Sequence, residues 1–412
     1  MASTVDQVTQ RRRGVGLIAH DPALSAGGYT LIAPQTADGH VYLVDIEGRV
    51  AHEWKLPVRA GRHAVILPNG NLGYNGNHPR SPDRYAPWSM WHGGDFYEVT
   101  PQGEIVWRHE DPDHHHDAQW LPNGHLLYAA CAPVPEGFAE RVPGGTAHGT
   151  GEVMYGDVIR EVDRSGRLVW EWKAWEHLEP EDFPIHPGFG RYHWPLVNGL
   201  GVRADGSVLM SLRTTSGIIA VDKASGAVTL HIPPSVVSHQ HAPVALANGH
   251  ILAFDNGNFR EGAHVAFSRV VEIDPVDHRV VWSYQDEMVN AFYTAFMGNA
   301  QRLWNGNTHI TESATGRLFE VTPAGDVVWD YILPWFAEYP DAAARRTGPG
   351  RLNSVFQTWR YHADQLPWLG AAGRLAWAST AGNWRPGCWA RPGFRRQPAP
   401  PRLGPTPGPA SR

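Results

Sequence analysis

Histidine is the residue type that most clearly offers chemistry in this sequence. The chain of 412 residues has 23 histidines, and His63, His116 and His241 each stand about seven residues before an Asn-Gly dipeptide. An imidazole can act as a nucleophile, move a proton or bind a metal ion. If these positions are equivalent in a repeated structure, the three side chains converge, and the spacing predicts one shared titratable site.

Two further histidines flank this set. Side chains two residues apart on a strand share a face, so His239 accompanies His241. His115 takes the opposite face from His116, where it could orient a neighbouring imidazole. The repeated register favours a functional site over a set of unrelated, hydrogen-bonded core histidines.

Arginine and asparagine residues could hold an anion beside the histidines. Arg213 and Arg260 each follow a predicted strand, and guanidinium groups suit sulfate, phosphate or carboxylate. Asn198 and Asn256 are further candidate donors. The sequence has no G-x-x-x-x-G-K-[ST], Cys-x-x-Cys or G-x-S-x-G motif. Because these motifs are absent, the sequence indicates neither a nucleotide-phosphate loop nor a nucleophilic serine.

A repeat supplies the elements that must position these residues. Each copy has a strand, a turn with Gly or Asp, and a strand that ends in an aromatic residue. The copies begin at Val44, Val99, Val162, Val221, Ile273 and Val321. Between them lies a second element, two strands around Asn-Gly or Asp-Gly, which is a strong hairpin signal. Six copies of four short strands predict an all-β, six-bladed β-propeller with four-stranded antiparallel blades.

The two ends of the chain are predicted to close the ring. The first copy lacks its own inner strand, and residues 353–363 are available to supply it, which joins N- and C-terminal strands in one blade. The predicted organisation is an N-terminal arm at 1–27, the propeller at 28–370 and a tail at 371–412. The tail is rich in proline and arginine and is expected to be disordered.

Composition indicates which kinds of partner and which cellular compartment to expect. The net charge of −6 does not favour a general nucleic-acid or anionic-membrane surface. No apolar run of about 18 residues is present, so no transmembrane helix is expected. The N-terminus has no convincing signal peptide, and two cysteines do not indicate a disulfide framework, so a cytoplasmic location is expected. The oligomeric state is not predicted.

Two stretches carry a family resemblance. They read HQHAPVALANGHILAFDNG from His239 and QRLWNGNTHITESATGRLFEVTP from Gln301. Both are similar to the bacterial arylsulfotransferases, also called aryl-sulfate sulfotransferases. The resemblance implies a six-bladed propeller that moves a sulfuryl group from an aryl sulfate to a phenolic acceptor through a sulfohistidine, without a nucleotide donor. No cofactor and no metal are predicted for this reaction.

Carried over by position, the resemblance assigns roles to individual residues. His241 matches the family's blade-four histidine, and Arg260 matches the arginine that follows it. Asn198 matches the asparagine of a His-x-Asn element whose histidine is Leu196 here. The candidate catalytic residues are His241 and His116. The candidate substrate-binding residues are Arg260, Arg213, His63, His239, His115, Asn198 and Asn256.

Two other functions stay open. The chain could be a metal-dependent lyase or hydrolase in which His63, His116 and His241 bind a divalent cation. It could instead be a non-catalytic propeller that binds a ligand or another protein. Bound metal distinguishes the first alternative, and a histidine sulfated by an aryl sulfate distinguishes the enzyme that the resemblance implies.

Overall fold

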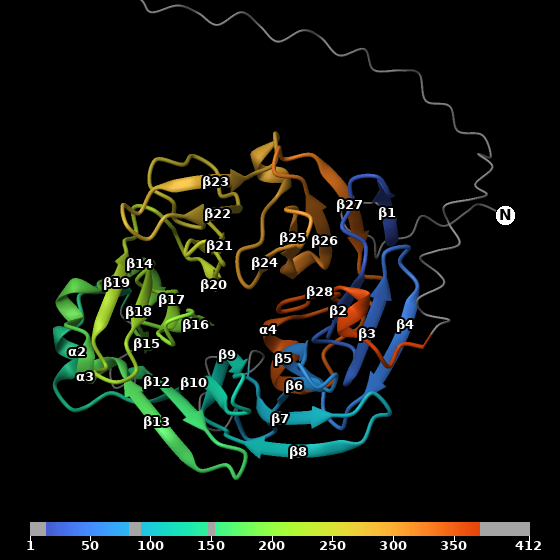
Figure 1. Cartoon of the computed structure of the whole chain (residues 1–412). Coiled ribbons are helices and arrows are strands. Elements are labelled where there is room, and N and C mark those ends of the chain that lie inside the picture. Colours follow the sequence, from blue (N-terminus) through green and yellow to red (C-terminus); the bar gives the residue numbers. More distant parts are fainter. Residues whose placement is uncertain (1–13, 82–91, 147–152, 371–412) are drawn as a thin grey trace, which may run out of the picture. The chain divides into compact units, whose positions relative to one another are not determined.

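The computed structural model describes residues 14–81, 92–146 and 153–370. Within the unit Met1–Trp368 these residues form six sheets set as blades around a central axis (Figure 1). The prediction of an all-β, six-bladed propeller is confirmed. The predicted disordered tail at 371–412 and the start of the predicted arm lie outside the described residues. Among the described residues, every helix is too short or too polar to cross a membrane.

Each blade runs from an inner strand at the axis to an outer strand at the rim. Blade 1 has β28 (Trp359–Tyr361), β2 (Tyr29–Ile32), β3 (His40–Asp45) and β4 (Val50–Lys55), and blade 2 has β5 (Ala60–Ile66), β6 (Leu72–Asn77), β7 (Gly94–Val99) and β8 (Ile105–Glu110). Blade 3 has β9 (His114–Trp120), β10 (Leu126–Pro133), β12 (Tyr155–Val162) and β13 (Leu168–Lys173), and blade 4 has β16 (Val197–Val202), β17 (Val208–Leu212), β18 (Ile218–Val221) and β19 (Val228–Ile232).

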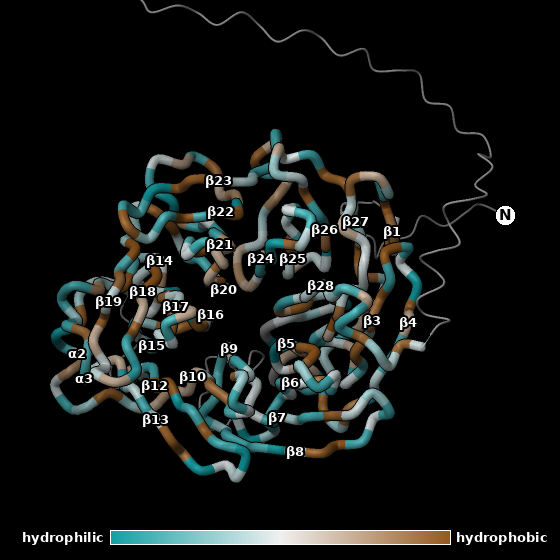
Figure 2. The backbone as a smooth tube through the Cα atoms, in the orientation of Figure 1, coloured by the Kyte–Doolittle hydropathy of each residue, from teal (hydrophilic) through white to brown (hydrophobic). Residues whose placement is uncertain are grey.

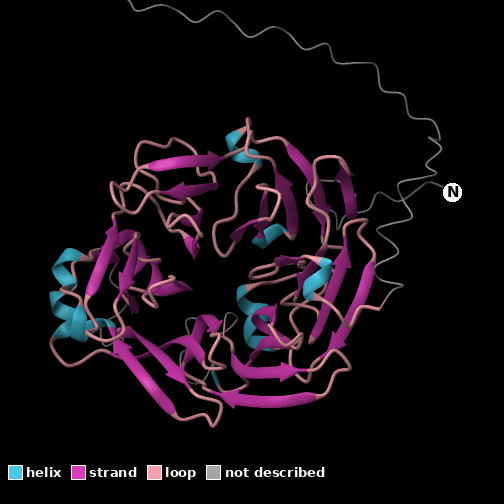
Figure 3. Ribbon diagram, viewed as in Figure 1, coloured by secondary structure: helices cyan, strands magenta, loops and turns pink. Residues whose placement is uncertain are grey.

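The last two blades follow the same plan. Blade 5 has β20 (His241–Ala245), β21 (Ile251–Asp255), β22 (Arg269–Ile273) and β23 (Val280–Tyr284), and blade 6 has β24 (Asn299–Arg302), β25 (Thr308–Glu312), β26 (Arg317–Val321), β27 (Val327–Ile332) and β1 (Gly16–His20). The connections contain β11 (Gly144–Thr146), β14 (Ile185–Gly190), β15 (His193–Trp194) and the short helices α2 (Phe138–Arg141), α3 (Ala174–His177) and α4 (Ala342–Thr347) (Figure 3).

A tryptophan on the outer strand joins each blade but one to the next blade. The indole Nε1 of Trp54 donates to the backbone oxygen of Thr100, in the turn between β7 and β8, at 3.0 Å. Trp107, Trp170, Trp282 and Trp329 make the same kind of bond, at 2.8 to 2.9 Å, to Arg164, Lys223, Pro323 and Ile46. In blade 4 Leu230 takes this place and offers no donor. The repeated tryptophan therefore encodes a contact between blades.

Strands from the two ends of the chain close the ring. β28 pairs antiparallel with β2, with Tyr361 opposite Tyr29. The segment 353–363 thus supplies the inner strand of blade 1, as the sequence predicts. β1 pairs antiparallel with β27 and adds a fifth strand at the rim of blade 6 (Figure 1). Both blades at the seam therefore combine N-terminal and C-terminal strands.

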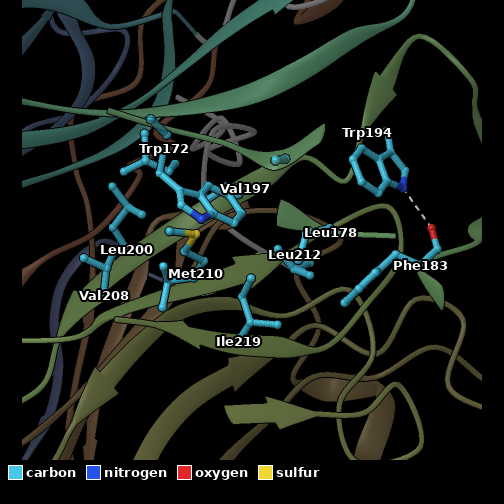
Figure 4. Packing of buried hydrophobic residues seen from close by; sticks show 14 of the residues in the cluster. Trp172, Leu178, Phe183, Trp194, Val197, Leu200, Val208, Met210, Leu212 and Ile219 are labelled. Carbon is cyan, nitrogen blue, oxygen red and sulfur yellow. Dashed lines mark hydrogen bonds between the residues drawn. The ribbon is translucent and has the colours of Figure 1, made fainter. Parts of the chain in front are cut away.

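Apolar side chains fill the spaces between neighbouring blades. Polar and apolar stretches alternate along the strands, as the teal and brown segments of Figure 2 show. Between blades 3 and 4 the buried cluster includes Trp172, Trp194 and Met210 (Figure 4). The indole of Trp194 donates to the backbone oxygen of Phe183 at 2.9 Å. This packing holds the inner strands in a fixed register around the axis.

Candidate functional site

The candidate site lies where the inner strands begin. His116 is the third residue of β9, His241 opens β20, and Asn198 is the second residue of β16. All three side chains are buried. Equivalent ends of inner strands meet at one end of a propeller channel. In agreement, His241, on a different blade, is among the groups that lower the pKa of His116, after burial, Arg62, His115 and Arg213.

The backbone is unusual at this end of the channel. Seven non-glycine residues in the described ranges have a positive φ. Four of them lie within two residues of the start of an inner strand, namely Leu196, His239, Ala242 and Met297, with φ of 64°, 60°, 48° and 61°. Such conformations cost roughly 1–3 kcal/mol and cluster at functional sites. Their position supports the assignment of function to this end.

Three buried side chains in series determine where His116 carries its proton. His115 Nε2 lies 3.0 Å from Asp157 Oδ1 and 3.2 Å from the backbone oxygen of Ala130, and because both are acceptors, Nε2 is protonated. His115 Nδ1 is then an acceptor, and it lies 2.7 Å from His116 Nδ1, which must donate. Burial, followed by Arg62, lowers the pKa of His116 well below its ordinary value. His116 is therefore neutral, with a lone pair on Nε2.

His241 has the same tautomer, and its Nε2 lone pair accepts a hydrogen bond. Its Nδ1 donates to Asn256 Oδ1 at 2.7 Å. The Asn256 amide is oriented by Nδ2, which donates to the backbone oxygens of Thr294 and Met297. The backbone N–H of Met297 donates to His241 Nε2 at 3.1 Å. Burial, followed by Arg213, lowers the pKa of His241 to about 3, so this ring is also neutral.

Two arginines make this end of the channel positive. Arg62 is fully buried, and both Nε and Nη2 donate to the backbone oxygen of His115, at 2.6 Å from Nε. Within the described ranges Arg62 Nη1 makes no hydrogen bond, and no carboxylate lies within ion-pair distance of this guanidinium. Arg213 lies over the ring of Phe189, with its guanidinium carbon 4.9 Å from the ring centroid.

Other predicted residues surround this centre. His63 Nδ1 lies 3.5 Å from Asp117 Oδ1, and burial lowers the pKa of His63. The ring centroid of His239 lies 4.7 Å from that of Phe189 and 6.0 Å from that of Phe259. Neither ring nitrogen of His239 makes a hydrogen bond within the described part of the chain. Phe189 and Phe259 thus form an aromatic wall beside His239.

Arg260 and Asn198 have partners of their own. Arg260 Nη2 lies 3.1 Å from Asp255 Oδ2, and its guanidinium carbon lies 4.1 Å from the ring centroid of Phe267. Asn198 Nδ2 donates to the backbone oxygen of Gln240 at 2.8 Å. The arginines that lower the pKa values of His116 and His241 are Arg62, on β5, and Arg213, directly after β17.

The sequence patterns did not single out three residues of the site. Arg62 directly precedes His63, and this neighbouring position was a usable signal. Asp157 lies within β12, and His193 lies on β15, where its Nε2 is 3.2 Å from Asp157 Oδ1. No local motif links Asp157 to the histidines of other elements, so only the fold brings them together.

A cavity of about 140 Å³ is lined by residues that follow the histidines on the inner strands. Its lining comes from β9, β16, β20 and the segment around β28, and includes Asp117, Leu200, Pro243 and Gln357. Burial raises the pKa of Asp117 above its usual value. The cavity therefore offers both apolar surface and a carboxyl group beside the positive end.

The buried histidines predict an acid-sensitive fold. The folded-state pKa of His241 is about 3, whereas the unfolded chain protonates histidine near pH 6.5. The unfolded state thus binds more protons between these values, and the free energy of unfolding falls as pH falls through this window. We expect His241→Asn to reduce the slope of the free energy of unfolding against pH by about one proton, or ~1.4 kcal/mol per pH unit. Urea unfolding at a series of pH values measures this slope. Equal slopes for the two proteins would contradict this prediction.

Two protein-family models match parts of the chain. The arylsulfotransferase family matches residues 24–235, and a second match, described as outer membrane protein assembly factor BamB, covers residues 156–384. No curated protein matches the chain in sequence.

Solved structures show distant likeness. A protein of unknown function from Bacteroides caccae is 14% identical, with a TM-score of 0.49, and the match covers 81% of this chain and 98% of that chain. A streptogramin B lyase is 11% identical over 78% of this chain and 83% of its own, with a TM-score of 0.43. Virginiamycin B lyase from Staphylococcus aureus is 12% identical over 78% and 85%, with a TM-score of 0.41. At these TM-scores none of the three bears on function.

Proposed function

The chain belongs to the arylsulfotransferase family, and we propose that it moves a sulfuryl group from an aryl sulfate to a phenol through a sulfohistidine on His116. The proposal depends mainly on the environment of Arg62. It is a fully buried cation without a carboxylate partner in the described ranges, and it lies beside two neutral histidines. A buried, unpaired charge is costly unless a counter-charge compensates it. A sulfate ester provides such an anion.

His116 is the better nucleophile of the two catalytic candidates. The relay through His115 to Asp157 keeps the proton on His116 Nδ1, so the lone pair that attacks sulfur is the one on Nε2. The same relay stabilises the positive charge that develops on the ring when Nε2 forms a bond to sulfur. His241 Nδ1, by contrast, donates to the neutral Asn256 amide, so no carboxylate stabilises a charge that develops on this ring.

The reaction then has two balanced steps. His116 Nε2 attacks the sulfur of the aryl sulfate, the N–S bond forms, and the S–O bond breaks with its electron pair leaving on a phenolate. The oxygen of a second phenolate then attacks the same sulfur, and the N–S electron pair returns to Nε2. Arg62 and Arg213 provide positive charge for the sulfate oxygens in both transition states. No nucleotide donor is needed.

Phe189 and Phe259 supply a surface for the aryl group. Their ring centroids lie 5.3 Å apart in an edge-to-face arrangement, and both rings pack against His239. Aromatic rings prefer such edge and offset contacts. We therefore place the aromatic ring of the donor and of the acceptor, in turn, against this wall.

The test is p-nitrophenyl sulfate hydrolysis and transfer by the full-length protein. We expect a burst of about one p-nitrophenolate per chain without acceptor, steady turnover when phenol is added, and ping-pong kinetics. Protein quenched after the burst should carry its sulfuryl group on His116. Binding of p-nitrophenyl sulfate that is lost in Arg62→Met, with neither burst nor turnover, would instead indicate a non-catalytic binding propeller.

A further inference from the structure

His115, His193 and Asp157 form a buried cluster that contacts His116 through His115. The Nε2 atoms of both histidines lie 3.0 and 3.2 Å from a single oxygen, Asp157 Oδ1, and the N–H of Val197 donates to that oxygen at 2.9 Å. The other oxygen, Oδ2, is buried and makes no hydrogen bond within the described ranges. A carboxylate oxygen has two lone pairs, so three donors at one oxygen and none at the other is an uneven arrangement.

We propose that His115, His193 and Asp157 bind a divalent transition-metal ion such as Zn²⁺. The ligand atoms of the three residues all lie within 4.8 Å of one another. Tetrahedral zinc with bonds of about 2.0–2.2 Å places its ligand atoms roughly 3.3 Å apart. Two imidazoles and a carboxylate are a ligand set that suits zinc and other transition metals.

The charges of the cluster suit a cation. Burial alone would raise the pKa of Asp157, but His193 and His115 hold it below its usual value, so the carboxylate is ionised. Burial lowers the pKa of His115, and the neutral imidazole is the form that binds metal. No lysine or arginine among the described residues pairs with Asp157. A bound dication would compensate the charge of this buried carboxylate.

The binding test titrates metal-free, full-length protein with Co²⁺ and then Zn²⁺. We expect one Co²⁺ per chain, with the intense visible absorption of tetrahedral cobalt, and its displacement by Zn²⁺. Asp157→Asn and His193→Gln should each weaken Zn²⁺ affinity by about 100-fold or more. The matched control is His250→Asn, which removes a histidine paired with one carboxylate, Glu272, and should bind like the wild type.

Two results would overturn the site: wild-type protein that binds no Co²⁺ at one per chain, or folded variants that bind Zn²⁺ as tightly as the wild type. The cobalt spectrum of the wild type needs no variant, so a variant that fails to fold leaves the site testable.

Discussion

His116→Asn is expected to lower kcat/KM for p-nitrophenyl sulfate by about 10³-fold or more and to abolish the burst of p-nitrophenolate. Asparagine keeps a polar group beside His115, so the loss falls mainly on chemistry. The variant lacks the Nε2 lone pair that would form the N–S bond, and the relay to Asp157 then has no nucleophile to support. Stopped-flow absorbance gives the burst, and steady-state rates give kcat/KM.

His241→Asn is the matched variant, because it removes a second buried imidazole from the same end of the channel. We expect a loss of about 100-fold or less, through misplacement of the Met297 backbone that His241 holds, and we expect the burst to remain. The opposite pattern, with the burst lost in His241→Asn and kept in His116→Asn, would make His241 the nucleophile. The Met297 N–H would then have to leave Nε2 before attack.

Local patterns were sufficient to predict the propeller. Asn-Gly turns specify hairpins over a few residues, and the repeated outer-strand tryptophan turned out to bond the following blade. Ring closure was also predictable, because the first repeat lacks a strand that residues 353–363 can supply. Each of these inferences depends on residues close together in sequence or on the number of predicted strands. Both can be taken directly from the sequence.

The site was only partly predictable. The common register of His116 and His241 placed both near the axis, since equivalent residues of equivalent strands converge. Asp157, by contrast, reaches His115 from a strand two positions away in the same blade, and His193 reaches it from an insertion. Arg260 was predicted from its position after β21 to bind substrate, but the same position places it against Asp255. Hydrogen-bond partners depend on side-chain packing, which no spacing rule records.

Ring closure gives the largest expected effect on stability. Arg360 on β28 and Glu320 on β26 form a fully buried ion pair across the seam, with 2.8 Å between Nη1 and Oε2. Arg360 Nε also donates to Thr30 Oγ1 on β2 at 3.0 Å. Arg360→Met leaves the Glu320 carboxylate buried without its cation, so the free energy of unfolding should fall by about 3–5 kcal/mol. Urea unfolding followed by tryptophan fluorescence measures this loss.

The double variant Arg360→Met with Glu320→Gln separates charge from packing. Glu320 Oε1 accepts the N–H of Ala26 at 2.7 Å and Asn307 Nδ2 at 2.6 Å, and the glutamine oxygen can keep both bonds. The double variant should therefore be more stable than Arg360→Met alone, because no charge is left buried. Arg49→Met, which breaks the exposed pair with Asp45, should cost less than about 1 kcal/mol. If Arg360→Met cost no more than Arg49→Met, the seam would be held by the β28–β2 ladder and its packing, and the buried pair would serve only to select the partner strand.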